Sequence, residues 1–274
     1  MKHVLRILPL ALFLTPFGAL AHEVWLDTDK WQMEPADDLV VSLKNGEDFD
    51  GVELSWLDRR MTRFDMVTGD GVTPLQGRAG DIPAVQTTAP DAGLAVLAYA
   101  STHSTVRYKT WEKFMSFANH KDLARDIPGI AMFHQTNTLP LADFKEVYWR
   151  HSKALLGVAD AKGTDRELGL ETEFVALTNP YTNDMSGGFR AVLLYQGGPR
   201  DLTQVEVFAR APDKSVTVTR LRTDAAGVVT VPVTAGHTYL LDSVVLRRPD
   251  PALAKLTGAI WETHWAALTF QVPQ

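Results

Sequence analysis

Short segments in which apolar and polar residues alternate recur through most of the chain, and turn residues separate them. Val52–Leu57, Arg63–Val67, Val205–Ala209 and Val216–Thr219 all alternate with a period of two. This period is typical of strands with one buried face. Many short strands between clusters of Gly, Pro, Asn and Asp favour β-sandwiches. The sequence therefore predicts a mainly β fold built from two sandwich domains of the immunoglobulin or fibronectin type.

Two stretches in the middle of the chain break this pattern. Apolar residues recur at helical spacing, first at Trp111, Phe114, Met115 and Ala118, and then at Phe144, Val147, Tyr148, His151 and Leu155. We therefore expect an N-terminal β-sandwich at 22–109, a helical connector at 110–160, and a fibronectin- or transthyretin-like sandwich at 161–274.

The first 21 residues have the pattern of a secretory signal peptide. Lys2 and Arg6 precede a largely apolar run at 7–17, and the small-residue motif Ala19-Leu20-Ala21 follows. Cleavage after Ala21 gives a mature chain that begins at His22 and points to a periplasmic location. No second run approaches about 18 apolar residues, so we expect no membrane span in the mature chain.

Composition limits the chemistry that is open to the chain. It contains no cysteine, which excludes thiolate metal sites and thiol redox chemistry. The formal charge of −6 becomes −8 without Lys2 and Arg6, and no dense basic run is present, so we expect no nucleic-acid partner. The common nucleophile, phosphate-loop and dinucleotide motifs are absent. We therefore predict a binding protein rather than an enzyme.

A histidine at the mature N-terminus is the residue of greatest chemical interest. The free α-amine and the imidazole of His22 stand on one backbone unit and together form a bidentate nitrogen chelate. The two groups titrate near pH ~8 and ~6.5, so a transition metal displaces both protons around neutrality. His22 is therefore the first candidate metal ligand.

The partners of His22 must come from nitrogen and oxygen donors elsewhere in the chain. His264 lies beside Glu262 in the aromatic segment Trp261–Trp265, and His103 follows an apolar run expected to be a buried strand. We predict His103 and His264 as further metal ligands, with Glu262 and Glu23 as oxygen ligands or as residues that orient the histidines. The other mature histidines are interpreted as surface or core residues: His120, His134, His151 and His237.

Several longer motifs resemble one exported family of unknown function. They are the start His22-Glu-Val-Trp25, the run Leu168–Tyr181 with Asn179-Pro180-Tyr181, the run Phe189–Gly197, and the end Trp261–Phe270. Members of that family are often described as periplasmic accessory components of nickel and cobalt uptake. The resemblance implies two β-sandwich domains, and nickel or cobalt delivered to a membrane transporter. The donor types also suit copper and zinc.

Two other functions remain open from the sequence. A histidine-brace copper protein, or a mono-copper oxidase as in lytic polysaccharide monooxygenases, also begins with histidine on a β-sandwich, although the second histidine and axial aromatic residue of a brace have no evident counterpart. A metal-free carbohydrate or adhesion module is the other alternative, because seven tryptophans could line a sugar groove.

Overall fold

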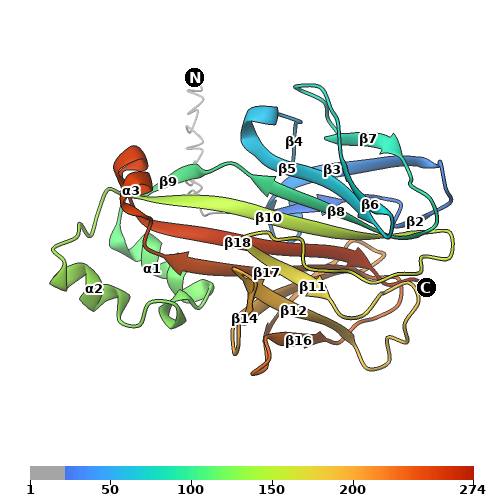
Figure 1. The fold of residues 1–274 in the computed structure, drawn as a ribbon. Coiled ribbons are helices and arrows are strands. Elements are labelled where there is room, and N and C mark those ends of the chain that lie inside the picture. The colour runs from blue at the N-terminus through green and yellow to red at the C-terminus, as the bar shows by residue number, and fades with distance from the viewer. Residues whose placement is uncertain (1–21) are drawn as a thin grey trace, which may run out of the picture.

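The computed structural model describes residues 22–274, and the leader expected at 1–21 lies outside the described residues. The fold is mainly β, as predicted, and consists of three stacked sheets with helices at one end (Figure 1). None of the described helices is long and apolar enough to cross a membrane.

A ten-stranded sheet forms the middle layer and takes strands from both halves of the chain. Its order is β15 (Val216–Arg222), β14 (Gln204–Arg210), β17 (Thr238–Arg247), β18 (Ala259–Gln271), β10 (Phe144–Val158), β8 (Gly93–Ser101), β5 (Met61–Thr68) and β6 (Gly71–Pro74). The short strands β2 (Gln32–Met33) and β9 (Ser104–Tyr108) also pair with β10. β10 and β18 run parallel at the centre. The two ranges expected as separate sandwiches therefore share this sheet.

Two four-stranded sheets cover opposite faces of the central one. The N-terminal sheet contains β1 (Glu23–Asp27), β3 (Asp38–Glu47), β4 (Asp50–Leu54) and β7 (Val85–Thr88), and the C-terminal sheet contains β11 (Thr172–Ala176), β12 (Phe189–Tyr195), β13 (Gly198–Pro199) and β16 (Val228–Val231). Successive strand residues point to opposite faces, and β10 shows this directly. Leu156 packs in the core under the N-terminal sheet, and Leu155 packs in the core under the C-terminal sheet. We call these two sides of the central sheet the N-face and the C-face.

Three α-helices lie together at one end of the molecule (Figure 1). They are α1 (Trp111–His120), α2 (Ile130–Thr136) and α3 (Pro251–Thr257), and two single 3₁₀ turns, η1 (Asp58–Arg60) and η2 (Leu123–Arg125), complete the elements. α1 is the helix expected from its apolar spacing. Thr110 caps its first turn by accepting a hydrogen bond from the amide of Lys113. Its buried face packs on Trp261 and Trp265 of the N-face.

The helix expected at 144–157 is wrong, because this segment is β10, the longest strand of the protein. The connector predicted at 110–160 is therefore helical only in its first half. β10 is buried on both faces along most of its length, and its buried residues include the polar Glu146, Arg150 and Lys153, so no period of two in apolar residues appears. The apolar run Trp265–Val272 predicts a final strand from Trp265, but β18 begins earlier, at Ala259.

Candidate metal centre

The residues predicted as metal ligands fall into two groups on opposite sides of the central sheet. The ring of Trp265 faces the N-face, where the Nζ of Lys121 lies 4.8 Å from its centroid and Lys121 binds Glu23. His264 precedes Trp265 in β18 and so points to the C-face. The structure therefore does not bring His22 and Glu23 together with His264 and Glu262.

On the C-face, His264 lies in a buried layer of aromatic rings. Its ring stacks on Trp149 at 4.9 Å, and Trp149 in turn contacts the exposed His103 at 5.7 Å. The Nε2 of His264 is 2.7 Å from Oε1 of Glu262, which also accepts a hydrogen bond from Arg247. His264 and Glu262 are thus in contact, whereas the ring of Trp149 separates His264 from His103.

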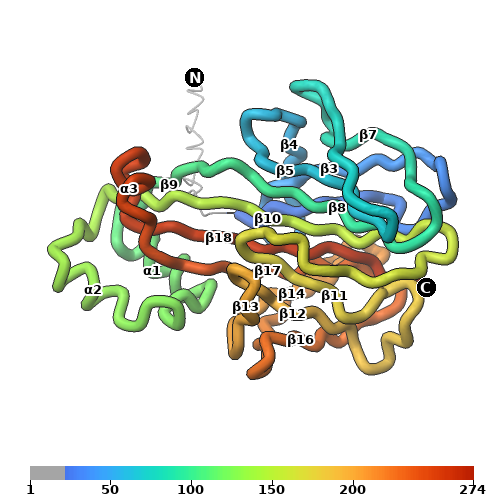
Figure 2. Tube along the Cα trace, in the orientation of Figure 1, coloured from blue at the N-terminus to red at the C-terminus, as the bar shows by residue number. Residues whose placement is uncertain are grey.

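His103 lies between two strands that pair with the same edge of β10. β8 and β9 both pair antiparallel with the same edge of β10, and Thr102 and His103 lie between them. Figure 2 shows β9 continuing the line of β8 beside β10. The buried strand predicted before His103 is therefore β8, and only two residues separate it from β9.

The N-terminal group contains a partner for His22 that the sequence did not suggest. β1 pairs antiparallel with β3 from Glu23 opposite Gly46 onward, so the same register places His22 opposite Glu47. The Nδ1 atom of His22 lies 3.1 Å from Oε1 of Glu47. This Nδ1 is buried and has no hydrogen-bond partner of satisfactory geometry among residues 22–274. An imidazole nitrogen and a carboxylate oxygen therefore face each other at the first of the described residues.

A tight hairpin puts Glu47 in this position. Glu47 and Asp50 pair at the ends of β3 and β4, and the turn between them consists of Asp48 and Phe49. Both have positive φ angles, of 51° and 60°, as a two-residue hairpin with the right-handed strand twist requires. Phe49 is buried and packs edge-to-face on Trp25 of β1 at 5.6 Å. This contact ties the turn to the strand that follows His22.

A cavity of about 290 Å³ opens beside the hairpin. The elements β1, α1, β14 and β15 close its other sides. Its charged lining consists of Glu23, Glu47, Asp48, His120, Lys121, Glu206 and Arg220. Four carboxylates thus face two permanent cations and one histidine, which makes the wall acidic on balance.

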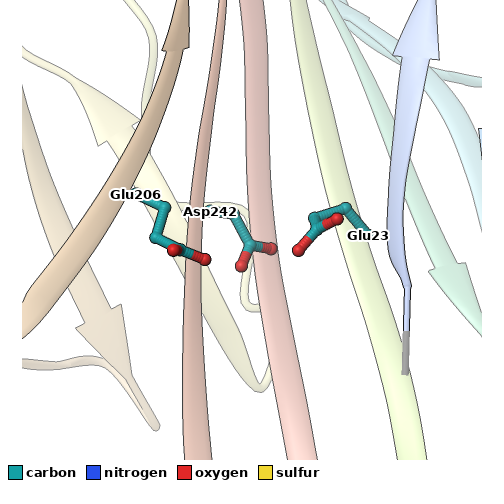
Figure 3. Close-up of side chains that lie close together, drawn as sticks. All are labelled: Glu23, Glu206 and Asp242. Carbon is teal, nitrogen blue, oxygen red and sulfur yellow. The ribbon is translucent and has the colours of Figure 1, made fainter. Parts of the chain in front are cut away.

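Three buried carboxylates meet under this cavity, from three different strands. Glu23, Glu206 and Asp242 have ligand oxygens within 4.8 Å of one another, and Figure 3 shows their carboxylates turned toward a common centre. Lys121 supplies the cation for that centre: its Nζ lies 2.6 Å from Glu23, 2.5 Å from Glu206 and 2.9 Å from Asp242. We call these four residues the Lys121 cluster. Its centre holds an ammonium group of the chain itself.

Two carboxyl groups of the Lys121 cluster, those of Glu206 and Asp242, have very different pKa values. Burial alone raises the pKa of Glu206, but hydrogen bonds from His120 and Lys121 and the charge of Lys121 lower it to about 2. Burial raises the pKa of Asp242 to about 7, against the attraction of Lys121 and together with repulsion from Glu23. Burial disfavours the charged form of Lys121, yet the three carboxylates raise its pKa well above the ordinary value.

His120 lies near the same cavity, but both of its ring nitrogens are engaged. Nε2 lies 3.0 Å from Oε1 of Glu206, and Nδ1 lies 3.0 Å from a guanidinium nitrogen of Arg220. The sequence placed His120 on the surface, and its side chain is indeed half exposed. The missed residues of this region, Glu47 and Lys121, have no motif that marks them, because only strand pairing and helix packing bring them to the N-terminus.

Comparisons with known proteins place the chain in a family without assigning it an activity. No curated protein matches it. The crystal structure of Salmonella alpha-2-macroglobulin reacted with methylamine is similar over 92% of this chain and 15% of that chain, with 9% sequence identity and a TM-score of 0.23. So low a score carries no argument. The family model described as a domain of unknown function, DUF4198, matches residues 19–246, and the chain therefore belongs to this family.

Proposed function

We propose that the mature chain, beginning at His22, is a periplasmic protein that binds a divalent transition metal through the α-amine and Nδ1 of His22. Glu47 supplies a carboxylate ligand in this proposal. The observation that carries it is the buried Nδ1, which lacks a hydrogen-bond partner and faces Oε1 of Glu47 at 3.1 Å. A buried nitrogen lone pair beside a carboxylate oxygen is a donor set that suits a cation.

The chemistry of this donor set fits nickel, cobalt and copper(II). Amine and imidazole are nitrogen donors of intermediate softness, and the carboxylate adds charge neutralisation. Affinity for such sites rises from cobalt through nickel to copper, so availability decides which metal is bound. Resemblance of the mature start and of the later motifs to nickel and cobalt uptake accessories supports nickel or cobalt as cargo. A membrane transporter is the corresponding partner.

Residues around His22 contribute binding and orientation. The acidic wall formed by Glu23, Glu47, Asp48 and Glu206 attracts a cation toward the N-terminus. Both nitrogens of His120 are paired, one with Glu206 and one with Arg220. This pairing argues against a copper-binding histidine brace with His120 as its second histidine, because a brace needs a second imidazole with a free lone pair.

Calorimetric titration of natively processed protein with nickel, cobalt and copper(II) tests the proposal, with the N-terminus confirmed by mass spectrometry. We expect one tight site, which is lost in His22→Ala and in a variant that keeps one extra residue before His22. His103→Ala is the matched control and should bind as the unmodified protein does, because His103 contacts Trp149, whose ring lies on the C-face. Equal affinity of the extended variant would refute the chelate.

A further inference from the structure

Two side chains of β10 hold the edge of β1 that does not pair with β3. Nη2 of Arg150 donates to the carbonyl of His22 at 2.8 Å, and Oγ of Ser152 donates to the carbonyl of Val24 at 2.6 Å. Both pairs are two residues apart along their strands, as expected where one strand edge lies across the face of another. The chain start is thus fixed by the central sheet as well as by β3.

Arg150 is an unusual residue for this task, because it is almost fully buried. Its exposed fraction is 4%, and its guanidinium lies 3.9 Å from the ring centroid of Trp265 and 4.5 Å from that of Tyr148. Among the described residues, no carboxylate forms an ion pair with it, and its Nε and Nη1 have no hydrogen-bond partner. A buried guanidinium with so few partners is costly for stability. Within the described part of the chain, the one hydrogen bond of its guanidinium goes to the carbonyl of His22.

The β1–β3 ladder starts only at Glu23, so it does not include His22. The α-amine and the imidazole both extend from the Cα atom of His22, and a chelate requires both nitrogens to point at one position. A first residue without an anchor would have to give up its backbone freedom when the metal binds. A bond to its carbonyl removes that freedom beforehand.

We propose that Arg150 is a positioning residue of the N-terminal metal centre, and that its bond to the carbonyl of His22 sets the metal affinity by fixing the chelating residue in advance. This inference rests on the proposed function. It assigns Arg150 no contact with the metal. It also explains why an arginine with two unpaired nitrogens stands in the core at this position.

Ser152 allows an effect on the position of His22 to be distinguished from an effect on the stability of the fold. It holds the same edge of β1 two residues further along, but the residue it binds, Val24, carries no ligand atom. Loss of either bond loosens β1 and lowers the melting temperature. Only loss of the Arg150 bond releases His22.

The test uses natively processed protein, with nickel for affinity and copper(II) for electron paramagnetic resonance. We expect Arg150→Met to weaken nickel binding about tenfold, the effect of ordering roughly one residue, and to change the copper(II) spectrum. Arg150→Lys, which keeps the charge on a shorter side chain with one donor group, should recover part of the affinity. Ser152→Ala should lower the melting temperature yet keep both affinity and spectrum.

Three results would overturn the proposal. One is unchanged affinity and spectrum in Arg150→Met, or in Arg150→Lys if the methionine variant does not fold. Another is an equal loss of affinity in Ser152→Ala. The third is a lack of metal binding by the unmodified protein, or binding that survives in His22→Ala. That last result refutes the proposed function itself, so the two failures are distinguishable.

Discussion

Replacement of Lys121 by methionine removes the cation on which the buried end of the N-terminal region depends. Methionine has nearly the same length and no charge, so it fills the space between α1 and the sheet. It leaves Glu23, Glu206 and Asp242 with oxygens within 4.8 Å of one another and no ammonium between them. All three carboxylates are buried.

The expected loss follows from the geometry. Removal of one partner from a buried ion pair costs about 3–5 kcal/mol in the free energy of unfolding, and Lys121 has three such partners. The loss depends on pH. Burial holds the pKa of Asp242 at about 7, above its ordinary value of 3.8, so the protonated form favours the folded state, and stability falls as pH rises through that pKa. Without Lys121 the pKa rises further, so the variant should lose at least about 1 kcal/mol more at pH 8 than at pH 5.

Denaturation in urea at pH 5 and pH 8, followed by tryptophan fluorescence, measures both quantities. Lys113→Met is the matched control, because Lys113 lies on α1, the helix that Lys121 directly follows, and is exposed. The control should change stability by less than about 0.5 kcal/mol. A loss below about 1 kcal/mol in Lys121→Met, or an equal loss at both pH values, would refute the role assigned to the Lys121 cluster.

Three further predictions test other parts of the structure. Glu47→Gln should weaken metal binding by the mature protein roughly tenfold. Unchanged affinity in calorimetry would show that Glu47 is not a ligand. Burial and the nearby His264 lower the pKa of His151 to about 4; its neutral form favours folding, so this stability is present above pH ~6.5 and is lost as pH falls toward 4. Between pH 7 and pH 4, the free energy of unfolding of His151→Phe should therefore fall by up to about 3 kcal/mol less than that of the unmodified protein. Denaturation curves at the two pH values measure this difference. Gly51→Ala should cost about 1–3 kcal/mol, because a Cβ there lies 2.8 Å from the ring of Trp25 and closer still to the backbone of β3, whereas Gly69→Ala, with open space around it, should not.

The sequence predicted the strands that have one polar face and also the short apolar strand β8, but it failed at β10, which is buried on both faces along most of its length. Arg63–Val67 and Val205–Ala209 lie within β5 and β14 as expected. In β10, Phe144, Val147 and His151 happen to match helical spacing because both faces are buried and apolar positions are dense. Aromatic and β-branched neighbours were the remaining signal for a strand.

In the candidate site, the sequence pattern also predicted a turn at the wrong position. The pair Asn45-Gly46 has the composition of a hairpin turn, which predicts that the strand before it ends there. In the structure β3 runs on to Glu47, and the turn is Asp48-Phe49. This shift of two residues moves Glu47 from a loop to the position opposite His22. A carboxylate next to His22 could therefore not be found without the pairing of β1 with β3.

The Lys121 cluster and the proposed metal site at His22 are linked through one peptide unit. Glu23 follows His22 directly, and its carboxylate is held inward by Lys121 at 2.6 Å. Because successive residues of a strand point to opposite sides, a Glu23 fixed toward the sheet turns the imidazole of His22 the other way, toward Glu47. Lys121→Met should therefore weaken metal binding as well as folding, even though Lys121 contacts no proposed ligand atom of His22. Full metal affinity in a folded Lys121→Met protein would show that Arg150 and β3 alone suffice to orient the chain start.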